Sequence, residues 1–482
     1  MGYYRLKESY VLRGWEKLPW ALVRRPRNTV GFLSREEFDA LSLCNGKCDC
    51  DLKIVPERIR ELIRAAVEKE IVQPCSYGEG LTPDQEYRKY HNRFIRTAHW
   101  SITGKCNYRC RHCYMSAPEA KYGELSHETI MNIIDQLEEC GVMSVTLTGG
   151  EPLIRKDWWE IVDALLERHI AIRTIYSNGA LVNEALLQEL SRRGIKPEFN
   201  MSYDGDEGWH DWLRGIPGAG EAVLRAFDLC YEMGFPTGAE LCIHQGNKHL
   251  LRQSIRTLAD HHCTHLKTNP VSETELWERL GGDYSISMKE TLELYLEYIP
   301  AYFEDGRPLS LMLGGFFSCN GKNSRGGEKV EWTIPLKKYN GGDKCLNQTV
   351  CGHARQVMYL SPEGRMLPCM SLSSYDIQEE YPLVTEVGLQ KGLTDSVYMK
   401  LIDTRVDEFL AHTEECGACE YAKICAGGCR ASALCYDKTD IMAPDRAACL
   451  IFREGYGKRL EEVLKELHID REGVLWHEPY IG

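Results

Sequence analysis

The sequence predicts an α/β protein, a partial (β/α)6 barrel between a small winged-helix-like N-terminal domain and a cysteine-rich C-terminal domain. Three observations carry this prediction. Six strand-then-helix units follow one another within residues 94–303, a separate mixed unit precedes them in residues 1–85, and cysteine spacing dominates residues 345–450. A chain of 482 residues is also too long for one ordinary core.

The N-terminal unit combines two β-rich runs with two helical patterns. The runs read YYRLKESYVLRGW and WALVRRPRNTVGFL, and the helical patterns read SREEFDALSLC and VPERIRELIRAAVEKEIV. Ser34 and Glu37 have the spacing of a capping box, which predicts that the first helix begins there. The stretch GEGLTPDQ, residues 78–85, is typical of a linker.

The barrel is predicted from strands that alternate with amphipathic helices. The six strand-like runs are RFIRTAHWSITG, GVMSVTLTGGE, IAIRTIYSNG, PEFNMSYDG, FPTGAELCIH and THLKTNP, and DWWEIVDALLERH and EAVLRAFDLCYEM are two of the helices between them. Such alternation indicates a parallel sheet, which right-handed crossovers curl into a partial barrel. We expect the functional site in the loops that follow the strands.

Three further segments complete the predicted organisation. Residues 304–344 are rich in Gly, Lys and Asn and indicate a bridging segment with little core. The cysteine-rich domain follows over residues 345–450. Within residues 451–482, the run FREGYGKRLEEVLKELH predicts one closing helix.

Charge and targeting signals limit the classes of partner and the cell compartment that we expect. The formal net charge of -13 argues against nucleic acid or an anionic membrane surface as a partner. The N-terminus has no apolar signal region, and no stretch has the roughly 20 apolar residues of a membrane span. We therefore expect a cytoplasmic protein. In a reducing compartment, the 21 cysteines indicate metal binding or catalysis rather than disulfides.

The stretch CNYRCRHCY places Cys106, Cys110 and Cys113 on one loop. A 4Fe-4S cluster normally takes four thiolates, so three would leave one iron open to another ligand. Zinc held by the three cysteines and His112 is the alternative, and the spacing alone does not distinguish a zinc site from a cluster site. LTGGEP then ends the next strand, where glycines permit close backbone approach and Glu151 presents a carboxylate.

The CxxxCxxC loop after one strand and the GGE after the next resemble the radical S-adenosylmethionine (radical SAM) superfamily, over roughly residues 94–300. The resemblance implies that Cys106, Cys110 and Cys113 bind three irons, while SAM binds the fourth. Gly149, Gly150 and Glu151 would then hold the amino end of SAM. A reductant such as flavodoxin or ferredoxin supplies the electron, and the product is a 5'-deoxyadenosyl radical that abstracts hydrogen from substrate.

The same resemblance implies further SAM contacts. His112 occupies the position where the family usually has an aromatic residue beside the adenine. Ser202 and Arg214 match the pair that binds the SAM carboxylate, for which a guanidinium is well suited. The alternatives are a strand residue satisfied by backbone for Ser202 and a surface ion pair for Arg214. Asn178 is first a turn residue, with a ribose contact as the alternative.

The C-terminal cysteines have the spacing Cx5C, Gx4C, CxxCx5CxxxC and C. The central run alone also fits a zinc ribbon. The whole pattern resembles the SPASM domain of radical SAM maturases, which implies two auxiliary 4Fe-4S clusters and three clusters in all. Auxiliary cluster I would bind Cys345, Cys351, Cys369 and Cys429, and auxiliary cluster II would bind Cys416, Cys419, Cys425 and Cys449. Gly364 lies in the turn of a hairpin that delivers Cys369.

The remaining cysteines have other expected roles. Cys140, Cys230, Cys242 and Cys263 lie in helix or strand patterns and are expected to be packing thiols. Cys435 is a possible replacement ligand. Cys44, Cys48 and Cys50 form a candidate labile metal site for which the sequence offers no fourth ligand nearby.

The SPASM resemblance implies a peptide or protein substrate. Sulfatase-maturing enzymes have an aspartate base where this chain has Met370, which argues against that reaction. The N-terminal unit resembles the PqqD-like domains that bind leader peptides, and a structural cap on the barrel is the alternative. We therefore expect a maturase that forms a thioether, a carbon-carbon crosslink or a related oxidation in a ribosomally made precursor peptide. The alternatives are a sulfatase-maturase-like oxidase of a protein side chain and a non-catalytic iron-sulfur redox sensor or binding module.

Overall fold

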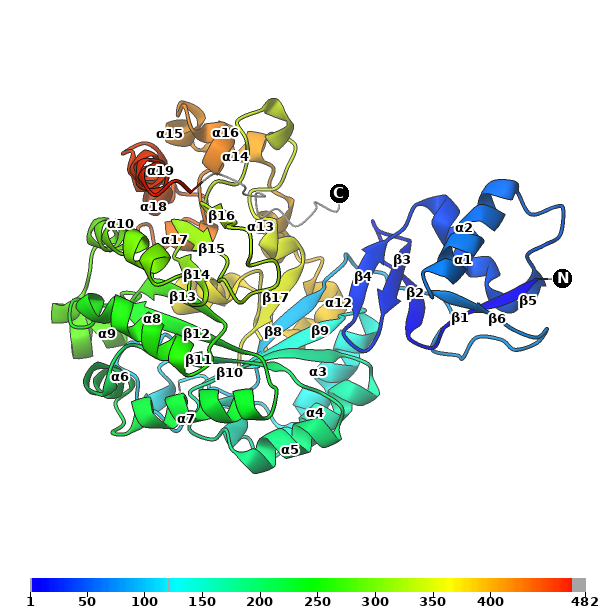
Figure 1. Ribbon diagram of the computed structural model, residues 1–482, viewed down its shortest axis with the longest axis horizontal. Coiled ribbons are helices and arrows are strands. Elements are labelled where there is room, and N and C mark those ends of the chain that lie inside the picture. Colours follow the sequence, from blue (N-terminus) through cyan, green and yellow to red (C-terminus); the bar gives the residue numbers. More distant parts are fainter. Residues whose placement is uncertain (1, 120, 470–482) are drawn as a thin grey trace.

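The computed structural model describes residues 2–119 and 121–469, and its largest feature is a curved eleven-stranded sheet (Figure 1). All six predicted barrel strands are present, and each is parallel to the next. The strands are β8 (Thr97–Ser101), β9 (Ser144–Thr148), β10 (Ala171–Ser177), β11 (Glu198–Ser202), β12 (Thr237–Ile243) and β13 (His265–Pro270).

Helices cover the outside of this sheet, as α3, α4, α5 and α7 show in Figure 1. In α3, the buried residues Ile130, Ile133, Ile134 and Leu137 recur at helical spacing, which gives the helix one apolar face. The barrel helices are α3 (His127–Glu139), α4 (Trp158–Glu167), α5 (Glu184–Arg192), α6 (Glu207–Arg214), α7 (Ala219–Glu232), α8 (Leu251–Asp260), α9 (Glu275–Gly281) and α10 (Met288–Glu304).

The segment expected to bridge the domains instead extends the barrel sheet. Strand β14 (Ser310–Leu313) pairs in parallel with β13, and β15 (Phe317–Cys319) and β16 (Trp332–Thr333) follow as antiparallel strands. Leu311, Leu313 and Phe317 are buried in the main core. The expectation of little core in residues 304–344 is wrong, because the Gly, Lys and Asn residues lie largely between short apolar strands.

The cysteine-rich region supplies the other edge of the same sheet. Strand β17 (Val357–Leu360) pairs in parallel with β8, and β18 (Met366–Leu367) pairs with β17 as a hairpin. Gly364 has a φ of 90° in the turn, as the sequence predicts, and Cys369 follows β18 after one residue, Pro368. The helices of this region are α11 (Val384–Val387), α12 (Leu389–Gly392), α13 (Ser396–Asp403), α14 (Val406–His412), α15 (Glu414–Gly417), α16 (Ala422–Cys425) and α17 (Arg430–Ala433).

The run FREGYGKRLEEVLKELH forms one closing helix, α19 (Tyr456–Glu466), as the sequence predicts. Helix α18 (Arg446–Phe452) precedes it, and Gly455, which has a φ of 88°, separates the two helices. Residues 470–482 of the predicted C-terminal segment lie outside the described residues. None of the helices in the described part of the chain is long and apolar enough to cross a membrane.

The N-terminal unit contains α1 (Arg35–Leu43), α2 (Glu57–Glu68) and two small sheets, ordered β5-β1-β6 and β4-β3-β2-β7. The Ser34–Glu37 capping box is present. The unit has more strands than predicted, because the second helix ends early and Val72 begins a strand. The strands are β1 (Tyr3–Leu6), β2 (Tyr10–Gly14), β3 (Ala21–Arg24), β4 (Thr29–Phe32), β5 (Asn45–Asp49), β6 (Val72–Pro74) and β7 (Arg88–Lys89).

This unit packs directly on the barrel. Asn28 Nδ2 donates to the carbonyl oxygens of Met143 at 2.7 Å and His169 at 2.6 Å. Trp15 from the N-terminal unit shares an apolar cluster with Phe94 and Met143. Both polar and apolar contacts therefore fix the unit to the barrel.

Candidate active site and metal centres

A cavity of about 430 Å³ lies beside the carboxyl ends of the barrel strands. Thr148, Ser177 and Ser202, each the last residue of its strand, line it. The cavity brings together all but one of the residues expected to hold the first cluster and SAM: Cys106, Cys110, Cys113, His112, Gly149, Gly150, Ser202 and Arg214. Glu151 is the exception.

The cysteine loop is fixed to the end of α6 by backbone hydrogen bonds. Arg109 N donates to Arg214 O at 3.2 Å, and Arg111 N donates to Leu213 O at 2.8 Å. Gly215 ends α6 in the left-handed conformation, and a Cβ there would lie 2.3 Å from Arg109 O. The close approach of loop and helix therefore requires glycine at position 215.

Each sulfur of this loop accepts a hydrogen bond. The donors are Tyr108 N to Cys106 at 3.3 Å, Arg214 Nη1 to Cys110 at 3.9 Å and Ala117 N to Cys113 at 3.4 Å. Burial raises the pKa of Cys106 to about 12 and that of Cys113 to about 11. Both thiols are therefore protonated at neutral pH in the metal-free protein, and iron must displace those protons on binding.

The GGE segment lies directly against the cysteine loop. Gly150 N donates to Thr103 O at 2.8 Å and Glu151 N donates to Lys105 O at 2.9 Å. A Cβ on Gly150 would lie 2.1 Å from Lys105 O, which is backbone and cannot move aside as a side chain would. Glycine at this position is therefore a packing requirement of the site.

Glu151 has different partners from those expected for a SAM ligand. Its buried carboxylate accepts hydrogen bonds from Leu153 N at 3.2 Å, Ser177 Oγ at 3.1 Å and Asn178 N at 2.8 Å. Burial raises its pKa to about 7. Glu151 thus ties the GGE loop to the turn after β10, while the Asn178 side chain lines the cavity and donates to Asn107 Oδ1 at 2.8 Å.

Arg214 is buried, so the surface ion pair considered for it is wrong. Its Nε donates to Asp204 Oδ2 at 2.7 Å, and His210 Nδ1 lies 3.2 Å from the same oxygen. Burial alone would raise the pKa of Asp204, but Arg214 and then His210 hold it well below its usual range. Sequence reasoning missed Asp204 and His210, although both lie in the same SYDGDEGWHDWLR stretch as Ser202 and Arg214.

Three buried polar atoms in the cavity wall have no hydrogen-bond partner among the described residues. They are His99 Nε2, His112 Nδ1 and Asn200 Oδ1. Burial lowers the pKa of His112 to about 3, so its imidazole is neutral. Unsatisfied buried polar atoms are rare in native proteins, and here they fit a polar ligand in the cavity.

The far wall of the cavity was not predicted from the sequence. His99 stacks on Tyr176 with ring centroids 5.3 Å apart, and Glu240 forms an ion pair with Lys267 at 3.9 Å. Glu240 and Lys267 are direct neighbours in the register of β12 and β13. Cys369 and Met370 from the cysteine-rich region also line this cavity.

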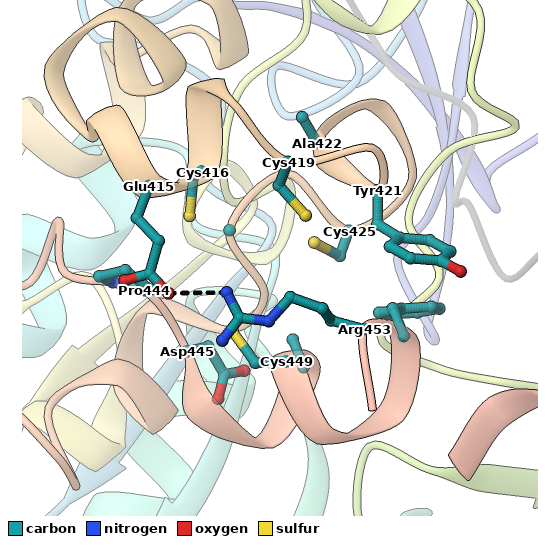
Figure 2. Close-up of a pocket in the computed structure, with 13 residues that line it drawn as sticks. Glu415, Cys416, Cys419, Tyr421, Ala422, Cys425, Pro444, Asp445, Cys449 and Arg453 are labelled. Atoms are coloured by element: carbon teal, nitrogen blue, oxygen red, sulfur yellow. Dashed lines mark hydrogen bonds and ion pairs between the residues drawn. The ribbon is translucent and has the colours of Figure 1, made fainter. Parts of the chain in front are cut away.

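The four cysteines expected to hold auxiliary cluster II line a second, narrower cavity. In Figure 2 the sulfurs of Cys416, Cys419 and Cys425 face a common space, and Cys449 approaches from α18. Arg453 Nη1 donates to Glu415 Oε1 at 2.9 Å at the edge of this space. Residues from three short helices and a loop thus meet at one site.

The cysteines expected to hold auxiliary cluster I are only partly grouped. Burial first, and then Cys429 and Cys351, raise the pKa of Cys369 to about 12, so these three thiols lie within electrostatic reach of one another. Cys345 is instead influenced by Lys423 and Asp343. Within the described ranges, no three His, Cys, Asp or Glu side chains converge closely enough to hold a single metal ion.

The other cysteines behave largely as packing residues. Cys140, Cys230 and Cys263 are buried in the main core, and Cys242 packs partly buried against other apolar residues. Cys44 and Cys50 are buried in the core of the N-terminal unit, where a hydrogen bond between them and burial raise the pKa of Cys44. Cys435 accepts a hydrogen bond from Tyr375 Oη at 3.2 Å.

Residues 100–256 match the family model of the Radical SAM superfamily. They form a radical SAM domain. SAM and a 4Fe-4S cluster are the cofactors of this family. The cavity residues fit both groups, since three cysteines, a glycine backbone and three unpartnered polar atoms line it.

Two curated relatives cover about 70% of the radical SAM chain. It is 25% identical over 335 residues to the PqqA peptide cyclase of Granulibacter bethesdensis, covering 69% of this chain and 81% of that one. It is also 25% identical over 374 residues to the AdoMet-dependent heme synthase of Methanosarcina barkeri, covering 74% of this chain and 96% of that one.

The structure of this chain is also similar to a solved structure, that of Streptococcus suis SuiB bound to the precursor peptide SuiA. The two superpose with a TM-score of 0.64 at 15% identity, covering 92% of this chain and 99% of SuiB. At this identity the likeness shows the fold. Because the match covers 92% of this chain, it must include part of the N-terminal unit.

Proposed function

We propose that the protein is a radical SAM enzyme that modifies a ribosomally made precursor peptide. One observation carries this proposal. A single cavity joins the cysteine loop and the GGE segment to Cys369 and Met370 of the cysteine-rich region, so the SAM site and an auxiliary site face one substrate space. Bound together, the cluster and SAM supply a 5'-deoxyadenosyl radical that abstracts hydrogen from the peptide.

The chain's own residues bind and orient these groups. Cys106, Cys110 and Cys113 hold three irons, and the backbone of Gly149 and Gly150 lies against the SAM amino end. Ser202 and the free face of Arg214 bind the SAM carboxylate, with Asp204 fixing the guanidinium. Neutral His112 offers its unpartnered Nδ1 to the adenosine part of SAM. Glu151 acts indirectly, by holding two loops in place.

The remaining eight cysteines hold two auxiliary clusters in this proposal. Cys416, Cys419, Cys425 and Cys449 share a cavity, which supports their assignment to cluster II. Cys351, Cys369 and Cys429 influence one another, which supports cluster I, and Cys345 would have to approach them on cluster binding. A flavodoxin or ferredoxin supplies electrons in the cytoplasm, where thiols stay reduced.

The open edge of β4 is the proposed binding place for the leader peptide. Leu33 N donates to Trp20 O at 2.9 Å, so by alternation the N–H groups of Phe32 and Val30 point away from β3. In the described sheet β4 has no neighbour on that side. A leader strand that adds there gains backbone hydrogen bonds and side-chain selectivity. SuiB, which shares the fold, is named as bound to its precursor peptide, which supports a peptide partner.

An oxidase of a protein side chain is the second candidate, and it needs a base in the cavity. Met370 has no basic group at the position where sulfatase maturases carry aspartate. Glu240 is the one carboxylate among the described residues that line the cavity, so Glu240 would be the base in this reaction. Lys267 Nζ lies 3.9 Å from its carboxylate and holds it at the cavity wall.

Anaerobic reconstitution followed by iron counting tests the proposal. The wild-type chain should bind about twelve irons, and replacing Cys106, Cys110 and Cys113 by Ala should remove about a third of them. The same replacement should abolish 5'-deoxyadenosine formation. Stoichiometric zinc with negligible iron would overturn the cluster assignment, and full iron without 5'-deoxyadenosine in the wild type would favour a redox sensor.

A further inference from the structure

Residues 338–341 contact the chain beside three of the auxiliary cysteines, Cys351, Cys425 and Cys429. Tyr339 N donates to Ile424 O at 3.0 Å, and Tyr339 Oη donates to Thr349 O at 2.9 Å. Gly341 N donates to Lys423 O at 3.1 Å. This segment therefore holds in place the residues just before Cys351 and Cys425.

Lys338 makes the central contacts of this segment. Its Nζ donates to Val350 O at 2.7 Å and to Gly428 O. These two carbonyls belong to the residues immediately before Cys351 and Cys429. A lysine ammonium has three N–H donors, so one remains after both carbonyls are satisfied.

The surroundings of this ammonium group are unusual for a lysine. Burial first, and then Arg430, lower its pKa, whereas Cys351, Cys429 and Cys425 raise it. Among the described residues no carboxylate forms an ion pair with it. The two carbonyl acceptors favour the protonated amine, because their oxygens carry partial negative charge and attract an ammonium group more strongly than a neutral amine. Its electrostatic partners are therefore cysteines assigned to both auxiliary clusters.

We propose that Lys338 is a fixed cation shared by the two auxiliary sites and that it raises the reduction potentials of both clusters. This inference rests on the cluster assignment under Proposed function. Reduction adds negative charge to a cluster, and a nearby cation in a poorly solvated site stabilises the reduced form. Lys338 is thus a positioning residue that tunes electron acceptance without touching the peptide.

Lys423 provides the matched control. It is also close to a predicted ligand, Cys345, but its side chain is 43% exposed and its Nζ pairs with Asp343 at 2.5 Å. Solvent and the partner carboxylate screen its charge. Removing this lysine should leave the potentials of the auxiliary clusters unchanged.

The experiment uses the full-length, anaerobically reconstituted enzyme with K338M, K338Q, K338R and K423M variants. Iron is counted, and the potentials are measured by redox titration followed by electron paramagnetic resonance. K338M and K338Q should keep their iron but shift the auxiliary midpoints downward, so that the reduced-to-oxidised ratio at a given potential falls at least tenfold, or about 59 mV. K338R and K423M should match the wild type.

The outcomes separate this inference from the proposed function. Full iron with unshifted auxiliary midpoints in K338M or K338Q would overturn the role of Lys338 while the cluster assignment stands. Loss of auxiliary iron from K338Q and K338R alike would show a purely structural role and also overturn it. A wild type that never binds the auxiliary irons would instead refute the cluster assignment itself.

Discussion

Gly150 shows how one absent side chain shapes the cofactor site. Its backbone lies so close to the cysteine loop that a Cβ would meet Lys105 O at 2.1 Å and Cys106 Cβ at 3.0 Å. The loop that presents Cys106 can therefore keep its position only beside a glycine. Steric fit, more than flexibility, explains this part of the GGE motif.

We predict that Gly150→Ala displaces the cysteine loop and weakens the first cluster. The variant should lose about a third of the roughly twelve irons on anaerobic reconstitution and should bind SAM far more weakly, as measured by equilibrium dialysis. Gly31→Ala is the control, because a Cβ there has its nearest neighbour 4.0 Å away. Normal iron content in Gly150→Ala would contradict the packing argument.

The sequence predicted motif residues better than their partners. Cys106, Cys110 and Cys113 are recognisable by spacing, because all three lie within one loop. Asp204 and the Glu240–Lys267 pair are not, since their contacts depend on helix geometry and on the register between β12 and β13. A sequence pattern reports neighbours along the chain but not neighbours across strands.

Short helices that each carry one or two cysteines build the second cavity. Cys416 lies in α15, Cys425 ends α16 and Cys449 lies in α18, so the site depends on how these elements pack. Elements of four residues have little stability of their own. The cluster itself is therefore expected to stabilise this region when it binds.

We predict that replacing Cys416 and Cys419 by Ala spares part of the SAM cleavage but stops peptide modification. The first cluster and SAM occupy a different cavity, so 5'-deoxyadenosine should still form, as measured by chromatography. Iron content should fall by about four. If this variant lost all SAM cleavage while the Cys106, Cys110 and Cys113 replacement retained it, the roles of the clusters would have to be exchanged.

At the level of elements, long periodic segments were predictable and short ones were not. The six barrel strands follow from alternating strand and helix patterns. Strands β14 to β16 escaped prediction because each has only two to four residues among Gly, Lys and Asn. The closing helix was also predictable, although α19 begins only after Gly455, whose φ of 88° separates it from α18.

The relation between the N-terminal unit and the barrel determines how leader binding should be tested. Removing residues 1–85 would uncover Tyr90, Phe94 and Met143, which share a core with Trp15. Weaker precursor binding after such a deletion could then come either from lost recognition or from lost stability of the barrel. A change confined to the open edge of β4 avoids this problem.

We predict that Val30→Pro weakens precursor binding while iron content and basal 5'-deoxyadenosine formation stay near wild type. Proline removes an N–H that points toward the open edge, and edge strands tolerate proline there. Binding of the precursor to the full-length enzyme is measured by calorimetry. Val30→Ala keeps the N–H and serves as control, and equal affinity of the two variants would argue for a leader site elsewhere.

The pairing of β17 with β8 has a consequence for how the protein is made. Residues 97–100 at the start of the barrel find their neighbours at residues 357–360. During synthesis, the N-terminal half therefore leaves the ribosome before β17 exists. Its β8 edge is then unpaired and can associate with other chains. Such long-range pairing also slows folding. A low concentration of unfinished chains should thus raise the yield of native enzyme, and expression of the barrel alone should give aggregated protein.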